Sequence, residues 1–168
     1  MNTKRNILLN PGPCTTSDEV KHAMVVPDIC PREEEFCLLM ESIKHDLPKV
    51  VNAGDDYTST LFASSGTGAV EAAITSAVPH DGKLLVIDNG AYGARMVEIA
   101  RRYKIDNIVY KIPYGDYPDV REIEKIIVNE KPTTIAVVDH ETTTGMRNPV
   151  LELCDMARQI AQKLLSIA

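Results

Sequence analysis

The stretch KLLVIDNGAYGAR, residues 83–95, sets an apolar run, a short polar turn and the start of a helix in direct succession. Residues 84–87 are continuously apolar, which is typical of a strand that helices cover on both faces. A second run of this kind, residues 135–138, follows later in the chain. Because helical patterns separate such runs, the stretch predicts parallel strand–helix–strand units.

The alternation extends outward from this stretch over most of the chain. Two helices are expected before it, one starting at the Thr16-Ser17-Asp18 cap and one with Pro31 in its first turn. We therefore expect an α/β fold of three layers, with a mostly parallel sheet between helices on both faces. The pattern predicts strands over residues 57–63, 83–88, 108–111 and 134–139, and helices over residues 68–78, 92–103, 119–129 and from about residue 150 onward.

The composition excludes several classes of function. The 168 residues include 18 Lys and Arg against 24 Asp and Glu, a net charge of −6, and no Trp. Such a chain offers no basic, aromatic surface for nucleic acid or an anionic membrane. The short apolar run at residues 7–9 indicates neither a signal peptide nor a membrane span, and four cysteines without C-x-x-C spacing indicate no metal site. We expect a cytoplasmic protein.

Three polar loops follow predicted strands, and ligands of parallel sheets bind at that edge. The first loop is SSGTGAVE, residues 64–71, whose small residues open a helix and suit a phosphate. A capped helix without a ligand is the alternative. A dinucleotide site with Asp88 on a ribose is another, although Glu71 stands where that fingerprint needs a small residue.

The second loop, residues 89–95, carries a ring and a cation between small residues. Tyr92 can stack on a flat cofactor and Arg95 can pair with an acid group; alternatively, Tyr92 covers the helix start and Arg95 is solvated. The third loop, HETTTGMRNP at residues 140–149, holds three consecutive hydroxyls. We expect Thr144 to cap the following helix, and Asp139 is a weak candidate for pairing with a pyridine nitrogen.

Together these loops resemble the class V branch of the fold-type-I pyridoxal-phosphate aminotransferases, most closely its 2-aminoethylphosphonate–pyruvate transaminases. The NGAYGARM and ETTTGM runs are the most specific part of the resemblance, which extends over most of the chain in family order. The matching stretches are LNPGP (residues 9–13), PDICPRE (27–33), YTS (57–59), SGTGAVE (65–71), NGAYGARM (89–96) and ETTTGM (141–146).

The resemblance implies a cofactor, pyridoxal 5'-phosphate, and a role for each matching residue. The third loop then has a family position of its own, so Asp139 loses the pyridine role. The implied cofactor residues are Ser65, Gly66 and Thr67 at the phosphate, Tyr92 on the ring face, and Thr142 near the ring hydroxyl with Thr143 beside it; Pro11, Gly12 and Pro13 at the substrate entrance and Arg95 are the implied substrate-binding residues.

The implied reaction moves the amino group of 2-aminoethylphosphonate to pyruvate, giving phosphonoacetaldehyde and alanine in phosphonate catabolism. The family acts as a homodimer on small molecules, an aminophosphonate and a 2-oxo acid. Residues 1–30 would form an N-terminal arm with the entrance loop, and residues 31–168 the N-terminal part of the cofactor-binding large domain. The C-terminal small domain would be absent.

The family's pyridine-pairing Asp and Schiff-base lysine are expected beyond residue 168, so no catalytic residue is assigned. Lys163 is expected on a helix as a solvated amine. The chain alone should then be inactive and should associate or be marginally stable. Two alternatives remain besides the nucleotide binder: another class V aminotransferase of the alanine–glyoxylate or serine–glyoxylate type, and a non-catalytic remnant that binds phosphate.

Overall fold

A computed structural model describes residues 6–159 and 163–167 of the chain. The chain divides into two compact units, Met1–Phe62 and Ala63–Ala168, and each is described by itself. The division falls between Phe62 and Ala63, whereas the expected arm ends at residue 30. Most of the basic start, residues 1–5, lies outside the described residues.

The first unit contains two helices, α1 (Asp18–Ala23) and α2 (Glu34–Val50). Ser17 caps α1 as expected, and its Oγ accepts a hydrogen bond from the Val20 N–H at 3.4 Å. Pro31 precedes α2 instead of standing in its first turn, because the helix begins only after Glu33. The strand predicted over residues 57–63 is wrong: this segment is irregular, because strand propensity without a partner strand does not form a ladder.

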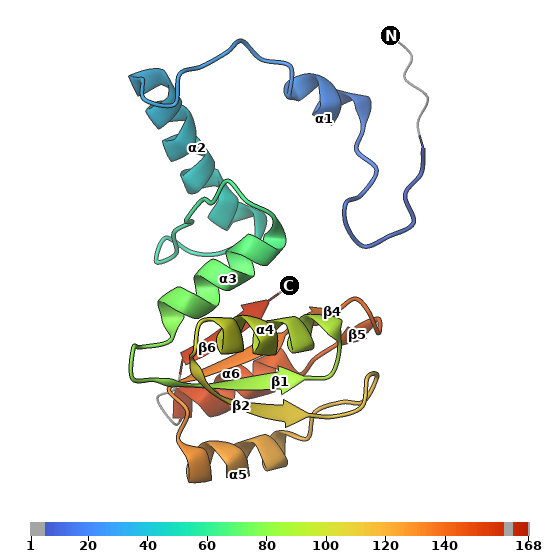
Figure 1. Ribbon diagram of the computed structural model, residues 1–168. Helices are drawn as coiled ribbons and strands as arrows, with labels where there is room; N and C mark the ends of the chain where they lie inside the picture. Colours follow the sequence, from blue (N-terminus) through green and yellow to red (C-terminus); the bar gives the residue numbers. More distant parts are fainter. Residues whose placement is uncertain (1–5, 160–162, 168) are drawn as a thin grey trace. The chain divides into compact units, whose positions relative to one another are not determined.

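The second unit is built around a four-stranded sheet with the order β2-β1-β3-β6 (Figure 1). All three strand pairs are parallel, whereas β4 and β5 form a small antiparallel hairpin. Its elements are α3 (Gly66–Ala77), β1 (Lys83–Asp88), α4 (Ala91–Arg102), β2 (Asp106–Lys111), α5 (Val120–Glu130), β3 (Thr134–Val138), β4 (His140–Glu141), β5 (Met146–Arg147), α6 (Val150–Gln159) and β6 (Lys163–Ile167).

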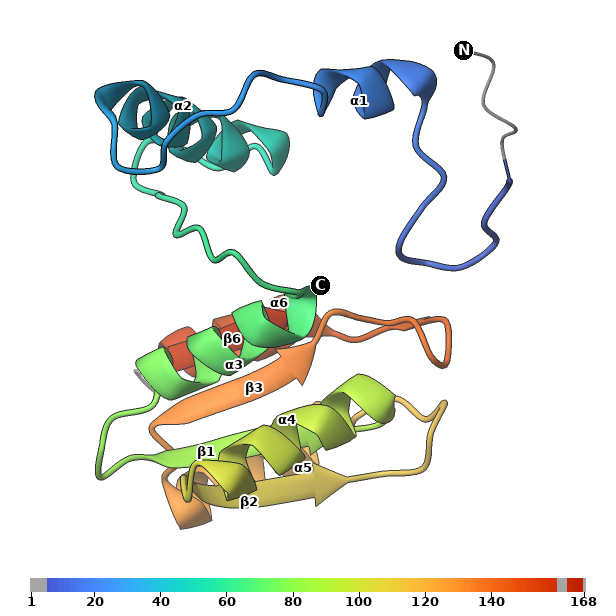
Figure 2. The same ribbon diagram turned by 45° about the horizontal axis from the view of Figure 1, so that its top comes forward.

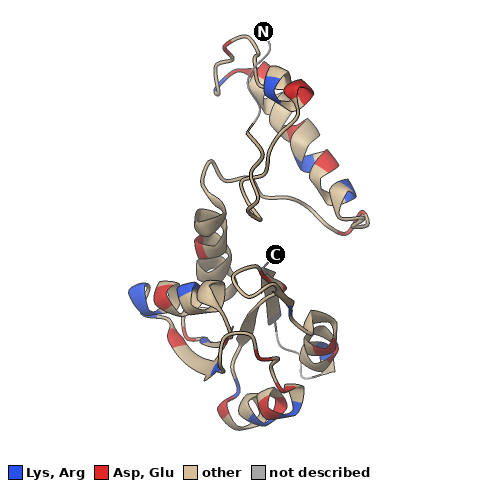
Figure 3. Cartoon of the chain, turned by 90° about the vertical axis from the view of Figure 1, so that its right-hand side faces the viewer, with Lys and Arg blue, Asp and Glu red and all other residues tan. Residues whose placement is uncertain are grey.

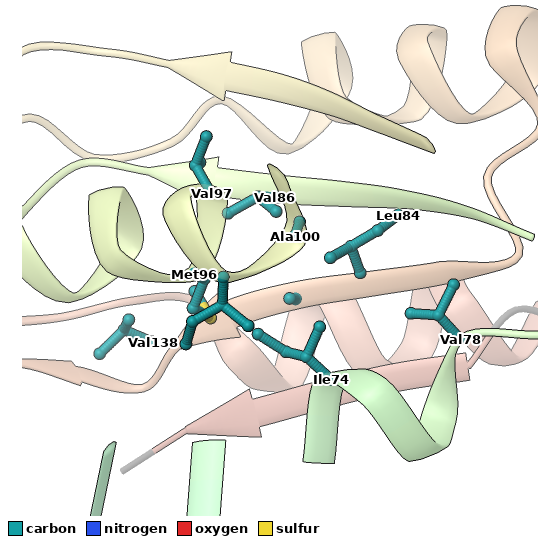
Figure 4. Packing of buried hydrophobic residues seen from close by; sticks show 10 residues of the cluster. Ile74, Val78, Leu84, Val86, Met96, Val97, Ala100 and Val138 are labelled. Carbon is teal, nitrogen blue, oxygen red and sulfur yellow. The ribbon is translucent and has the colours of Figure 1, made fainter. Parts of the chain in front are cut away.

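Helices cover both faces of this sheet, which confirms the predicted three-layer α/β fold (Figure 2). Leu84 and Val86 point to the face covered by α3 and α4, and Figure 4 shows Ile74, Met96 and Val138 packed in the same cluster. The alternate residues of β1 pack with α5 and α6 on the other face. Burial on both faces explains why residues 84–87 are continuously apolar.

The end of the chain differs from the prediction. The helix expected from residue 150 onward ends at Gln159, and Lys163–Ile167 forms strand β6. Lys163 pairs with Thr134, and Ile167 with Val138, so β6 runs parallel to β3. The short apolar run at residues 164–165 suits a helix or a strand, and the open edge of β3 decides between them. Residues 160–162 and 168 lie outside the described residues.

Charged residues of both signs are interspersed on α4, α5 and α6, whereas Glu71 is the one charged residue of α3 (Figure 3). Among the described residues, no helix is long and apolar enough to cross a membrane. In the same part of the chain, no group of three or more His, Cys, Asp or Glu side chains could hold a metal ion.

Candidate functional site

The start of α3 offers unused hydrogen-bond donors. The Ser65 Oγ accepts from the Gly68 N–H at 3.5 Å, and the Ser65 carbonyl accepts from the Ala69 N–H at 3.2 Å. Within the described part of the chain, the N–H groups of Gly66 and Thr67 have no protein partner. A Cβ placed on Gly66 would meet no atom within 4 Å, so this backbone is open to a ligand.

Arg95 on α4 connects this helix start to the second loop. Its Nη1 donates to the Thr67 Oγ1 at 3.1 Å, and its guanidinium carbon lies 5.1 Å from the centre of the Tyr92 ring. Tyr92 is 37% exposed, so the residue remains partly accessible. A cation, a hydroxyl and an aromatic ring therefore meet where α3 and α4 begin.

A second contact joins α3 and α4 at the other end of α4. The Tyr103 hydroxyl donates a hydrogen bond to the Glu71 carboxylate. This bond and the nearby negative charge raise the pKa of Tyr103, because both favour the protonated phenol. Glu71, which stands where a dinucleotide fingerprint needs a small residue, is thus hydrogen-bonded to Tyr103.

Glu141 ties the third loop to the start of α4. It is fully buried, and its Oε2 accepts from the N–H groups of Tyr92 and Gly93 at 3.2 and 3.4 Å. Its Oε1 accepts from the Thr143 N–H at 3.3 Å and from the Thr143 hydroxyl. The Thr143 Oγ1 in turn accepts from the Ala91 N–H at 3.2 Å. The two loops that carry Tyr92 and Thr143 are therefore held against each other.

A pair of buried amides links the same strand ends. Asn89 and Asn148 are 0% and 4% exposed and hydrogen-bond each other through both amide groups, at 2.8 and 3.3 Å. The Asn148 Nδ2 also donates to the Val138 carbonyl at 2.7 Å, and the Asn89 Nδ2 to the Asp116 carbonyl at 3.2 Å. Beside them Asp88 is only 3% exposed, and its Oδ1 has no partner among the described residues.

The structure brings most of the predicted site residues together. Ser65, Gly66 and Thr67 are linked through Arg95 to Tyr92, and through the α4 backbone to Thr143. Thr142 is exposed, and its hydroxyl has no partner in the described part of the chain. The Pro11-Gly12-Pro13 turn, where the Asn10 side chain donates to the Pro13 carbonyl at 3.0 Å, belongs to the first unit. Its place at a substrate entrance remains a prediction.

The structure shows what Thr144 and Asp139 of this region contact. Thr144 does not cap α6: its N–H and hydroxyl both donate to the Glu141 carbonyl at 3.1 Å and close the hairpin loop. Asp139 accepts from the Arg147 Nε at 3.3 Å across the hairpin, and its exclusion from the pyridine role stays a prediction.

Sequence reasoning missed Glu141, Asn89 and Asn148 as parts of the site. All three lie inside the motifs that were singled out, but their burial depends on two loops that meet only in the fold. The sequence carried one signal, a glycine just before the predicted helix. The structure gives its reason, because a Cβ on Gly90 would overlap the Glu141 carboxylate.

The donor set fits a phosphate ester of a flat ring. Two free N–H groups at a helix start, the Thr67 hydroxyl and the Arg95 guanidinium suit a dianion. The Tyr92 face suits an aromatic ring, and the Thr142 hydroxyl suits a polar ring substituent. Pyridoxal 5'-phosphate combines these three groups.

Comparison with known proteins gives the family of the chain. The pattern of the aminotransferase class-V family matches residues 20–167. The chain belongs to the class-V aminotransferase family. This class-V chain is 38% identical, over 167 residues, to the 2-aminoethylphosphonate–pyruvate transaminase of Klebsiella pneumoniae, and 38% identical over 161 residues to that of Bacillus cereus.

The class-V chain spans about half the length of these curated relatives. The matches cover 98% and 95% of this chain but 45% and 44% of the two relatives. The alanine–glyoxylate aminotransferase of Nostoc sp. superposes with a TM-score of 0.87 at 29% identity, covering 99% of this chain and 44% of its own. The ureidoglycine–glyoxylate aminotransferase of Bacillus subtilis shares the fold. It superposes with a TM-score of 0.86 at 22% identity, covering 99% of this chain and 42% of its own.

Proposed function

We propose that this chain forms the cofactor-binding part of a 2-aminoethylphosphonate–pyruvate transaminase that uses pyridoxal 5'-phosphate. The observation that carries the proposal is the hydrogen bond from Arg95 to Thr67 with Tyr92 beside it. It sets a cationic donor, free helix N–H groups and a partly exposed aromatic ring side by side. Fold likeness alone would not require these groups to meet.

Each residue has a defined task in this proposal. The N–H groups of Gly66 and Thr67 bind the phosphate, and Ser65 keeps the first turn of α3 in place through its cap. Tyr92 packs on the ring, and the Thr142 hydroxyl meets the ring hydroxyl. When bound, the cofactor supplies an electron sink for the amino group transfer.

The choice of amino donor rests on the relatives. Those named 2-aminoethylphosphonate–pyruvate transaminase reach 38% identity, whereas the alanine–glyoxylate aminotransferase of Nostoc sp. reaches 29%. We test it with a fusion to the part of the Klebsiella relative that this chain does not cover. The fusion should form alanine from 2-aminoethylphosphonate and pyruvate; amino transfer to glyoxylate alone would favour the glyoxylate-dependent alternative.

The lysine that would bind the cofactor covalently is not Lys163 in this proposal. Lys163 begins β6 and pairs with Thr134, at the amino ends of two parallel strands. The site lies at the carboxyl ends, roughly 13 Å along the strand at about 3.3 Å per residue. Borohydride reduction with the cofactor, followed by peptide mass mapping, should give no single stoichiometric lysine adduct. A unique adduct at Lys163, with formation of alanine, would contradict the assignment.

Binding of the cofactor tests the proposal directly. Pyridoxal 5'-phosphate should bind reversibly in an absorbance titration, and inorganic phosphate should compete. Thr67→Val removes the hydroxyl next to Arg95 and should weaken binding about tenfold, since a hydrogen bond to a charged group contributes about 1.5 kcal/mol or more. Thr75→Val is the matched control, because the Thr75 hydroxyl on the same helix donates to the Glu71 carbonyl at 2.8 Å. The proposal would be contradicted if inorganic phosphate did not compete with the cofactor, or if both variants weakened binding equally.

The role of Arg95 is separable by the choice of ligand. Its guanidinium can serve the cofactor phosphate or the acid group of the substrate, and its bond to Thr67 favours the phosphate. Arg95→Gln should then weaken pyridoxal 5'-phosphate about tenfold and leave pyridoxal, which lacks the phosphate, unchanged. If the variant and the wild type bound pyridoxal 5'-phosphate with equal affinity, Arg95 would be assigned to substrate binding instead.

A further inference from the structure

We infer that Glu141 is a positioning residue whose buried carboxylate occupies the N–H groups at the start of α4, and so directs the ligand phosphate to the start of α3. The inference rests on the proposed function, because it concerns the orientation of the same cofactor. It assigns a task to the fully buried carboxylate of the third loop, which no expected cofactor or substrate contact uses.

Two helices begin close together at this edge, and each start carries partial positive charge. The bond from Arg95, in the second turn of α4, to Thr67, in the first turn of α3, holds the beginnings of the two helices near each other. An anion is stabilised at either start, since both present N–H groups without partners inside the helix. If nothing else occupied these N–H groups, a phosphate could bind at the start of α3 or at the start of α4, and the ligand would have two orientations relative to the Tyr92 ring.

Glu141 removes this ambiguity at α4. Its Oε2 accepts hydrogen bonds from the N–H groups of Tyr92 and Gly93, at 3.2 and 3.4 Å. The Thr143 hydroxyl oxygen accepts a hydrogen bond from the Ala91 N–H. The first three residues of α4 therefore have internal acceptors. At α3 the corresponding groups of Gly66 and Thr67 remain free among the described residues.

The two acceptor oxygens of Glu141 and the shape of its side chain both matter. Each carboxylate oxygen accepts from two donors, so an amide in its place would turn N–H groups toward N–H groups on one side. Gly90 leaves the space that the carboxylate fills. The same four bonds fix the backbone of Tyr92 and Thr143, so the ring-stacking position and the phosphate position depend on one side chain.

Amide chemical shifts of the uniformly labelled wild-type chain provide the first test. Titration with inorganic phosphate should shift the amide signals of Gly66 and Thr67 and leave those of Tyr92 and Gly93 unchanged. Equal shifts at both helix starts would overturn the inference. This measurement needs no variant, so it holds whether or not a substituted chain folds.

Glu141→Gln provides the second test, with Glu124→Gln on the exposed side of α5 as the control for loss of one carboxylate. The Glu141 variant should gain phosphate-dependent shifts at Tyr92 and Gly93, lose amide-exchange protection at Tyr92 and Thr143, and bind pyridoxal 5'-phosphate about tenfold more weakly. Unchanged exchange and affinity in this variant would overturn the inference. If the wild type fails to bind the cofactor, the proposed function fails, and the exchange measurement still decides the role of Glu141.

Discussion

At the residue scale, the contact between Gly90 and Glu141 shows how one small residue makes room for a charge. Gly90 has an extended backbone that any residue adopts, so its conformation does not require glycine. The requirement is space, because an added Cβ would overlap the Glu141 side chain. Nearby, Gly93 is constrained by backbone, since its Cβ would lie 2.9 Å from the Asp88 Cα and the Ile87 carbonyl oxygen.

We predict that Gly90→Ala destabilises the fold by about 1–3 kcal/mol, the usual cost of added volume in a filled site. The buried carboxylate must move, and its hydrogen bonds to the α4 backbone weaken. Gly54→Ala is the matched control, because a Cβ there meets no atom within 4 Å. Chemical denaturation followed by circular dichroism measures both variants. Equal stability of Gly90→Ala and wild type would contradict the tight fit.

At the element scale, the runs at residues 84–87 and 135–138 predicted β1 and β3 correctly, because strands covered on both faces are apolar at every position. The same kind of reasoning failed at two other segments. Residues 57–63 have no partner strand and are irregular, although a strand was predicted. Residues 163–167 pair with β3 and form a strand, although a helix was predicted. The helix start at Gly66 and the position of Tyr92 at the start of α4 could be predicted from local motifs. Glu141 could not, because its donors lie on α4, 48 and 49 residues away in sequence.

The contact between α3 and α4 should respond to pH through Tyr103. Its hydrogen bond to Glu71 raises the pKa of the phenol, so the bond is fully present below the ordinary tyrosine pKa of about 10 and is lost as pH rises through the raised value. Glu71→Gln should return the pKa of Tyr103 toward its ordinary value. Absorbance titration, with Tyr103→Phe to identify the signal and Glu98→Gln as the control, measures this. An unchanged Tyr103 titration in Glu71→Gln would show that the bond is not formed in solution.

At the scale of the whole molecule, exposed apolar surface predicts self-association. Leu39, Ile43 and Leu47 form one stripe on α2 and are 44%, 37% and 40% exposed. Strands β2 and β6 lie at the edges of the described sheet, where free backbone groups invite pairing. Light scattering over a range of concentrations should detect oligomers, and Ile43→Gln should reduce them. Val128→Gln, at an isolated exposed position on α5, is the control. A monomer at all concentrations with a cooperative melt would contradict this prediction.

A crystal structure of the chain with pyridoxal 5'-phosphate tests the central claim most directly. We predict the phosphate within hydrogen-bond distance of the Gly66 and Thr67 N–H groups, the ring on the Tyr92 face, the Thr142 hydroxyl toward the ring, and Glu141 still bonded to the start of α4. A phosphate bound at the start of α4, or a cofactor bound away from the loops at the carboxyl ends of β1 and β3, would contradict the account.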